Sequence, residues 1–309
     1  MGLQVIANPL HGDPRRQAKE RRVGRVLGGA AYVSILLSAL IVLSLVFEAF
    51  TFITEVDLGE LFSSSGWIPR QGHFDLITIM VASLWVTGIA LLLAVPVGMA
   101  SAMYLSEYAK PGVRKVLKPI LEILAGIPSV VLGYFALRFI NPNIVQAIVP
   151  GANNAGNLVA AGIGVGILTI PLVASISEDA LAAVPGALRE ASAGLGATKM
   201  TTTLRVVTPA ALSGLVASFV IATSRAIGET MVVFIAGGAA DSAPRALSPG
   251  DGSLTMTAAM ASVASGTDNV AGVGPTFQSL FFVGLFLFLI TLGLNMFATR
   301  LVRRYREVY

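Results

Sequence analysis

Long apolar runs alternate with short polar segments along this chain. A helix needs about 20 apolar residues to cross the hydrocarbon core of a membrane. Six runs reach that size, and each predicts a transmembrane helix; they cover residues 26–50, 76–105, 116–140, 156–177, 210–238 and 277–301. Pro128 interrupts the third run, and the fourth is rich in glycine, which suits close helix packing in lipid. The pattern predicts an all-α polytopic membrane protein with six transmembrane helices.

The polar segments between these runs differ in kind. We expect a basic N-terminal segment over 1–25, a first helix over 26–50, an outer loop over 51–75 and the main membrane domain over 76–306. Within that domain, residues 178–208 place apolar side chains at helical spacing with charged ones between them. This spacing predicts one or two short amphipathic helices outside the membrane.

The basic residues indicate which side of the membrane each segment faces, because cytoplasmic loops are enriched in Lys and Arg. Of the 21 basic residues, 17 lie in the N-terminal segment, in the segments after the second and fourth spans, and in the C-terminal tail. The opposite loops contain only Arg70 and Arg245. We therefore expect both termini on the cytoplasmic side, as an even number of spans allows.

Composition narrows the class of protein further. The 309 residues are 55% hydrophobic and 12% charged, with a mean hydropathy of +0.79, whereas a soluble domain carries about 25% charged residues. A water-soluble enzyme, a disordered chain and a disulfide-stapled module are excluded. The sequence has no cysteine and two histidines, His11 and His73, so we expect no metal and no cofactor. The basic N-terminus is explained as a topology anchor rather than a nucleic-acid site.

Two nucleotide-binding patterns are absent or misplaced. The sequence contains no Gly-x-x-x-x-Gly-Lys-Ser/Thr, and therefore has no phosphate-binding loop of that type. The glycines between Gly162 and Gly166 lie inside an apolar span, with no preceding strand and no acidic partner for a ribose. We interpret them as packing residues.

The most specific motif lies in the segment 178–208. Glu190-Ala191-Ser is followed after three residues by Gly196, and after nine more by Val-Val-Thr-Pro209. This spacing resembles the EAA–G–I-x-L-P signature of ABC-importer permeases. In that family the element is the coupling helix, which docks on the ATPase subunit, so the resemblance implies this role for Glu190, Ala191 and Gly196. Physically it is a helix–turn–helix in which Gly196 turns the chain; an ordinary loop helix is the alternative.

Four further stretches resemble the permeases of ATP-driven phosphate importers, of the PstC type rather than the sister PstA type. They cover Tyr104–Ala109, Leu124–Val131, Ile176–Pro185 and Arg225–Val233, within a resemblance over about residues 67–306. One departure is the segment His-Phe-Asp75, which stands where that family usually has a Gly-Ile-Leu-Pro-like opening of the second span.

The resemblance carries several expectations. It implies the type-I ABC-importer permease fold with a cytoplasmic coupling helix, in the bacterial plasma (inner) membrane. It also implies three kinds of protein partner: a homologous permease in a heterodimer, a dimer of ATP-binding subunits and an external phosphate-binding protein. The chain itself would be a transport subunit and not an enzyme, in contact with membrane lipids and with no nucleic acid.

Ionisable residues inside predicted spans are candidate functional residues, since each costs about 2.5–3.5 kcal/mol to insert at the bilayer centre. Arg225 and Glu229 are four residues apart in the fifth span, which places them on one face of a continuous helix. They could form an internal ion pair or an oxyanion site, where a guanidinium offers a planar fork to phosphate oxygens. The resemblance to phosphate importers favours the oxyanion site, because that family uses charged residues of this segment for transport. Arg138, near the outer end of the third span, could line the pore mouth or extend to lipid headgroups.

Other functions remain open at this stage. A permease for another oxyanion, such as sulfate, molybdate or phosphonate, would share these features. A secondary transporter or channel would need no ATPase, which the coupling-helix signature disfavours. A membrane-embedded enzyme would need paired carboxylates or a histidine-containing site at one depth, and the sequence contains no such cluster.

Overall fold

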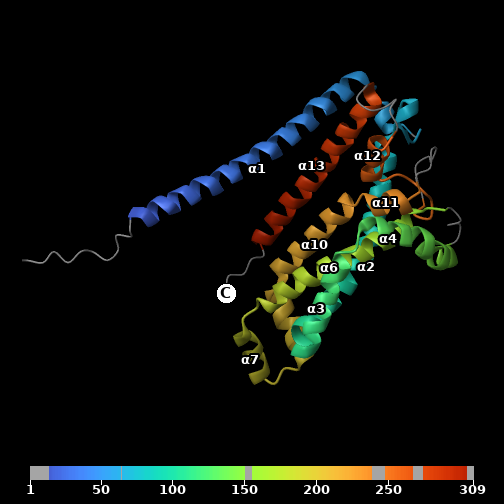
Figure 1. Ribbon diagram of the computed structural model, residues 1–309. Coiled ribbons are helices and arrows are strands. Elements are labelled where there is room, and N and C mark those ends of the chain that lie inside the picture. The colour runs from blue at the N-terminus through green and yellow to red at the C-terminus, as the bar shows by residue number, and fades with distance from the viewer. Residues whose placement is uncertain (1–13, 64, 150–154, 239–247, 267–273, 305–309) are drawn as a thin grey trace, which may run out of the picture. The chain divides into compact units, whose positions relative to one another are not determined.

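The computed structural model describes the chain in five stretches, residues 14–63, 65–149, 155–238, 248–266 and 274–304. Helices make up most of these stretches (Figure 1). The chain divides into two units, of which the first ends at Phe47 and the second begins at Glu48. Residues 1–13 of the predicted N-terminal segment lie outside the described residues, as do parts of the predicted outer loops and the end of the C-terminal tail.

The elements of the described chain are as follows. The longer helices are α1 (Pro14–Glu55), α2 (Leu76–Met103), α3 (Pro111–Ala125), α6 (Leu158–Ala182), α10 (Leu212–Gly228) and α13 (Gly274–Arg304). The shorter helices are α4 (Ser129–Phe135), α5 (Gln146–Ile148), α7 (Gly186–Gly194), α8 (Lys199–Thr202), α9 (Thr208–Ala210), α11 (Met231–Ala236) and α12 (Met256–Ala264). Wider π-helical turns form η3 (Tyr104–Tyr108), η4 (Ala136–Val145) and η5 (Thr203–Val207). Tight 3-10 turns form η1 (Glu60–Phe62) and η2 (Pro69–Gln71), and a hairpin joins β1 (Trp67–Ile68) to β2 (His73–Phe74).

Among the described residues, four helices are long and apolar enough to cross a membrane; they cover Ala18–Glu55, Leu76–Tyr108, Leu158–Ala182 and Gly274–Arg300. Two bent pairs qualify if each pair is taken as one span, namely Pro111–Ala125 with Ser129–Ile148 and Lys199–Ala210 with Leu212–Gly228. The total is then six, and each of the six regions overlaps one of the predicted spans.

The two bends change the picture of the third and fifth spans. The first pair is bent by 86°, and the break lies at Gly126–Pro128. The two helices on either side of it, α3 and α4, are labelled in Figure 1. Pro128 lacks a backbone N–H and disfavours helical geometry in the residue before it, so α3 cannot run on into α4. The second pair is bent by 73°, at Ala211 between α9 and α10. The sequence predicted an interruption at Pro128, and did not predict the bend at Ala211.

Helices α2 and α6 form the centre of the second unit, and glycine lets them approach closely. A Cβ added to Gly162 of α6 would lie 2.7 Å from Cβ of Ile89 on α2, and one added to Gly98 of α2 would lie 2.7 Å from Cβ of Val173 on α6. Both distances are shorter than real contacts allow, so these positions have no room for a side chain. The glycine-rich fourth run thus packs as small residues do in membrane helix pairs.

A small aromatic cluster covers the start of α2. The hairpin pairs Trp67 with Phe74, and the Phe52 ring stacks on Phe282 with centroids 4.8 Å apart. A hydrogen bond from Nδ1 of His73 to Oε1 of Glu60 (3.0 Å) holds the pKa of this carboxyl below its usual range. The hairpin turns through η2, which begins at Pro69.

Asp75, directly after the hairpin, is fully buried and caps α2. Its carboxylate accepts hydrogen bonds from the backbone N–H groups of Ile77 and Thr78. An Asp at this position satisfies N–H groups that have no partner within the helix. The segment that departs from the usual family opening therefore still begins the helix with a polar cap.

Candidate functional site

The segment predicted to bind a partner forms a helix–turn–helix. Helix α7 ends at Gly194, and Gly196 follows with a φ of +79°, in the left-handed region that favours glycine. The N–H of Gly196 donates to the carbonyl of Ala193 (2.9 Å), and the N–H of Ala197 donates to the carbonyl of Ser192 (3.1 Å). This pair of hydrogen bonds is the Schellman motif, which ends a helix and reverses the chain. The turn predicted at Gly196 is confirmed.

The same helix–turn–helix exposes both its motif residues and two large apolar side chains. Glu190, Ala191 and Gly196 are all exposed, and the Leu195 side chain at the turn is 90% exposed. Met200, on the next helix, is also exposed. A leucine so fully open to solvent, beside a tight turn, suits a surface that a partner covers. The first residues of the predicted segment, 178–182, instead extend α6 beyond the predicted end of the fourth span.

Helix α7 is joined to the long helices through two neighbouring side chains. Leu188 packs on the apolar cluster formed by the ends of α2, α6 and α10, which includes Ala102, Leu181 and Leu215. The guanidinium of Arg189 donates from Nη2 to Oε1 of Glu107 in η3 (2.7 Å). These two side chains therefore attach α7 to the long helices, one through an apolar contact and the other through an ionic contact.

A second ionic cluster lies near the end of α6, one helical turn before Leu181. The Glu178 side chain is 1% exposed, and its carboxylate accepts hydrogen bonds from Arg114 and from Nζ of Lys118 (2.7 Å), both on α3. Lys118 also contacts the exposed Asp179 at 3.2 Å. A buried carboxylate is tolerated only when it is paired and hydrogen-bonded, as here. The cluster ties α3 to the end of α6.

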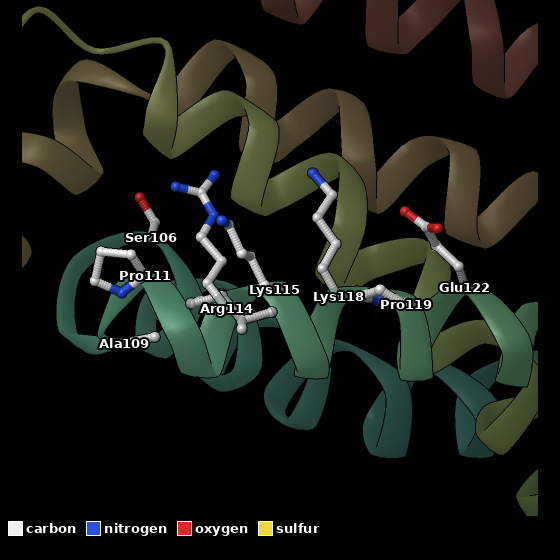
Figure 2. Close-up of a pocket in the computed structure, with 9 residues that line it drawn as sticks. Ser106, Ala109, Pro111, Arg114, Lys115, Lys118, Pro119 and Glu122 are labelled. Atoms are coloured by element: carbon white, nitrogen blue, oxygen red, sulfur yellow. The ribbon is translucent and has the colours of Figure 1, made fainter.

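These cations line one side of a cavity of about 480 Å³ next to α3. Figure 2 shows Arg114 and Lys118 extending from the same side of the helix, with Lys115 beside them and Glu122 further along. The three cations of the lining are Arg114, Lys115 and Lys118. Because Glu178 and Asp179 pair with the first and the last of them, the cavity carries little net charge. Its basic composition alone does not make it an anion site.

The two charged residues predicted to share a helical face lie at the end of α10. Arg225 lies in the last turn of α10, which ends at Gly228, and Glu229 has extended backbone angles with φ −68° and ψ 127°. The expectation of one continuous helix over this span is therefore wrong, because α10 stops at Gly228 and α11 starts only at Met231. In the described part of the chain, no hydrogen bond or ion pair joins the two side chains, so the internal ion pair is not formed.

The break itself is held in place by α12. The hydroxyl of Thr257 donates to the backbone carbonyl of Glu229 at 2.7 Å, and α11 resumes the helix at Met231. A cavity of about 340 Å³ adjoins the break and is lined by Gly228, Thr230 and Thr257, among others. Non-helical backbone at membrane depth is tolerated where it is buried in protein or lines a water-filled space. The break thus lies beside a mostly apolar cavity, which is lined by neither Arg225 nor Glu229.

Arg138 lies apart from this pair. It belongs to η4, is exposed, and its guanidinium carbon lies 5.7 Å from the ring centroid of Tyr134, in a cation–π arrangement. No hydrogen bond or ion pair connects it with Arg225 or Glu229 within the described ranges. The three predicted pathway residues are therefore not brought together within this one chain.

The sequence did not identify the ion pairs that the structure forms near α7, at the ends of α2 and α6. Glu107 and Arg189 are 82 positions apart, and Arg114 and Glu178 are 64 apart. Glu107 and Glu178 both lie in stretches that carry the family resemblance, but neither was proposed as a site. A signal was available, since each is an acidic residue at the edge of an apolar run.

A profile of the family described as "Binding-protein-dependent transport system inner membrane component" matches residues 94–307. The probable ABC transporter permease protein YqgH of Bacillus subtilis is 36% identical over 176 residues, which are 56% of each chain. The phosphate transport system permease protein PstC of Haemophilus influenzae is 31% identical over 279 residues, covering 85% of this chain and 86% of the relative. PstC 1 of Mycobacterium tuberculosis is 31% identical and covers 76% of this chain and 74% of the relative.

Solved structures show the same fold. A chain of a bacterial ABC transporter involved in the import of the acidic polysaccharide alginate matches with a TM-score of 0.65 at 15% identity, covering 94% of this chain and all of that chain. A chain of the inward-facing MetNI methionine ABC transporter matches with a TM-score of 0.56 at 20% identity, covering 75% of this chain and 96% of that chain. At such identities the likeness concerns the fold alone.

Proposed function

The chain belongs to the family of binding-protein-dependent transport system inner membrane components, and we propose that it is the PstC-type permease subunit of an ATP-driven importer of inorganic phosphate. The observation that carries the proposal is the similarity to phosphate permeases along most of both chains, 31% identity over 85% of this one. The protein has the all-α fold of type-I ABC-importer permeases, as its sequence predicted, and is a multi-pass inner-membrane protein. It is a transport component and not an enzyme.

The proposed importer contains three further kinds of subunit. A homologous permease forms a heterodimer with this chain, two ATP-binding subunits supply energy, and an external receptor delivers phosphate. The ATPase docks on α7 and the following turn, where Glu190, Ala191 and Gly196 are exposed. The exposed Leu195 and the lack of a phosphate-binding loop in the sequence support this division of labour. Both termini lie on the ATPase side of the membrane.

In this scheme ATP hydrolysis in the partner moves α7, and the permease pair alternates between outward-open and inward-open states. The bends at Gly126–Pro128 and Ala211 divide two of the spans into shorter helices. A short helix that ends at a bend can shift without dragging a whole span, which suits alternating access. The chemistry of the chain is thus binding and release, with no covalent step.

Arg225, Glu229 and Arg138 are the proposed pathway residues. Neither Arg225 nor Glu229 uses its side chain for a hydrogen bond or ion pair in the described chain, so both remain available to a ligand. A guanidinium presents a planar fork to phosphate oxygens. Phosphate at neutral pH still carries a proton, which it can donate to a carboxylate, whereas fully ionised sulfate cannot. Arg225 would therefore attract an oxyanion, and Glu229 would favour a protonated one.

Substitutions at the break test the substrate as well as the site. We expect Arg225→Lys to lose most phosphate uptake, because an ammonium cannot make the two parallel bonds of a guanidinium. We expect Glu229→Gln to lower phosphate uptake and to let sulfate compete, because Gln can donate as well as accept. The measurement is phosphate uptake by cells, with and without sulfate, at matched membrane levels.

The matched control is Arg300→Lys, the same exchange at an exposed position near the end of α13. It should leave uptake unchanged. If Glu229→Gln imports phosphate normally and sulfate competes no better than before, the break is a structural feature and not a selectivity site. Import of sulfate or molybdate in preference to phosphate by the wild type would instead assign the chain to another oxyanion importer.

A further inference from the structure

We propose that the ion pair between Arg189 and Glu107 is a positioning link that transmits displacement of α7 to α2. The inference rests on the proposed function in one respect, namely that an ATPase moves α7. It concerns the attachment of α7 to the long helices, and not the exposed residues proposed to dock the ATPase or the residues proposed to line the pathway. It assigns a role in transport to two residues that lie on different elements, 82 positions apart in the sequence.

The geometry of Arg189 is that of a cross-link between three elements. Arg189 belongs to α7, and its side chain extends to η3, the continuation of α2. There Nη2 donates to Oε1 of Glu107 at 2.7 Å and Nε donates to Oε2 at 3.2 Å. It also donates to two backbone carbonyls, that of Leu181 in the last turn of α6 at 2.8 Å and that of Val184 just after this helix at 2.6 Å. One guanidinium thus uses its fork to hold α2, α6 and α7 in a single arrangement.

The pair lies where it is shielded from water. The Glu107 side chain is 7% exposed and that of Arg189 is 27% exposed. Exposed ion pairs contribute little because water screens them, but a shielded bidentate pair is stronger and fixes direction as well as distance. The pair can therefore carry a displacement in a way that a surface pair could not.

On α7 itself few other contacts could replace this link, although Nζ of Lys199 on α8 lies 5.1 Å from the ring centroid of Tyr108 in η3. Within α7, which is described throughout, only Ser192 is buried, and its hydroxyl bonds to Thr202 on α8 (2.8 Å), within the same helix–turn–helix. Leu188 packs on the apolar cluster at the ends of α2, α6 and α10. That contact has no preferred direction, so it allows α7 to slide. The ion pair makes movement of α7 and movement of α2 a single event.

The end of α6 extends the connection to α3. Glu178 lies one turn before Leu181 and is held by Arg114 and Lys118 of α3. A displacement that enters through Arg189 therefore reaches α2 directly, and reaches α3 through α6. These are the helices that precede the bend at Gly126–Pro128.

The first test uses the complete importer, purified with its partner subunits and reconstituted in liposomes with the external receptor. Glu107→Gln removes the charge but keeps the size of the side chain and leaves both carbonyl bonds of Arg189 in place. We expect phosphate imported per ATP hydrolysed to fall about tenfold, the size of a typical coupling between sites. ATP hydrolysis and the yield of complex should stay close to the wild type.

Lys110→Gln is the matched control, since Lys110 is exposed and only three residues from Glu107. It should keep the wild-type ratio of import to hydrolysis. Arg189→Lys keeps the positive charge but loses the fork, and should lower the ratio too. The double variant Glu107→Gln with Arg189→Lys should be no worse than the poorer single one, because the pair is already broken.

A second measurement needs no substrate. The chain has no cysteine, so spin labels can be attached at Ala187 on α7 and Val97 on α2, both exposed. We expect one narrow distance distribution in the wild-type complex and a broadened one with Glu107→Gln, at an unchanged melting temperature. A merely structural contact would lower the melting temperature without loosening α7 in the folded complex.

Two results would overturn the proposal. One is a Glu107→Gln complex with the wild-type ratio of import to hydrolysis and the wild-type distance distribution. The other is a Glu107→Gln complex that does not assemble while Arg189→Lys transports normally, which would make the pair a folding contact. If the wild type imports no phosphate, the proposed substrate fails, and the distance distributions still decide the link.

Discussion

Gly196 illustrates how one residue can set the shape of a contact surface. Its φ of +79° is open to glycine but strained for residues with a Cβ. A Cβ added at this position would meet no atom within 4 Å, so space is not the constraint. The backbone conformation alone requires glycine, and the exposed Leu195 and Ala191 keep their positions only while the turn forms.

We predict that Gly196→Val uncouples ATP hydrolysis from uptake. Valine in the left-handed region costs about 1–2 kcal/mol, which is enough to populate another turn and displace α7. Gly196→Asn should be milder, because Asn visits this region more readily. Uptake and ATP hydrolysis in membrane vesicles, at matched amounts of protein, are the measurements.

Gly112→Ala provides the control at a helical glycine of α3, outside the proposed docking element, where an added Cβ also meets no atom within 4 Å. It should transport like the wild type. Normal uptake by Gly196→Val would count against a docking role for this turn.

At the scale of the element, the long helices are held by small residues and divided by bends. Gly162 and Gly98 let α2 and α6 approach until no side chain fits between them. Pro128 and Ala211 divide two other spans into shorter helices. The central pair therefore forms the rigid part of the unit, and the bent spans supply the segments that can shift against it.

We predict that Gly162→Ala destabilises the protein and that Gly88→Ala does not. The new methyl group of Gly162→Ala would lie 2.7 Å from Ile89 and force the two helices apart; overpacking of this kind costs about 1–3 kcal/mol. Gly88 lies on α2 with no atom within 4 Å of an added Cβ. Alanine there should stabilise the helix slightly, since it loses less backbone entropy than glycine.

Thermal unfolding in detergent measures both variants. The expected order of melting temperature is Gly88→Ala at or above the wild type, and Gly162→Ala below it. Equal melting temperatures for the two variants would mean that α2 and α6 are further apart than the glycine contacts indicate.

At the scale of the whole molecule, the distribution of charge predicts the orientation of the chain in the membrane. The basic residues gather at segments that the alternation of spans puts on one side, where α7 and its turn also lie. Positive charge is retained on the cytoplasmic side during insertion. The same rule therefore predicts that the proposed docking surface faces the side where ATP is available.

The orientation can be tested with single cysteines, because the chain has none of its own. We predict that an impermeant thiol reagent added outside sealed cells labels a cysteine at Ser64 or Ser248 and spares one at Ala187. Ser248 and Ala187 are exposed, and Ser64 lies outside the described residues. In inside-out vesicles the pattern should reverse. Labelling of position 187 from outside intact cells would refute the predicted orientation.

Much of this protein follows from the sequence alone, since the relevant signals are local. An apolar run of about 20 residues predicts a span wherever it occurs, and all six predicted runs overlap helical regions of the structure. The turn at Gly196 was predictable because it requires glycine at that one position. The family could be predicted too, since its signature is a short spacing of small and charged residues between two spans.

The tertiary structure decided what depends on residues distant in the sequence or on competition between neighbours. The pairing of Arg189 with Glu107, and of Glu178 with two cations of α3, requires helices that only the fold brings together. The periodicity that put Arg225 and Glu229 on one face assumed a continuous helix, but α10 ends at Gly228. A hydrogen bond from Thr257 to the carbonyl of Glu229 holds that broken backbone, and this partner, 28 positions away, cannot be inferred from an apolar run.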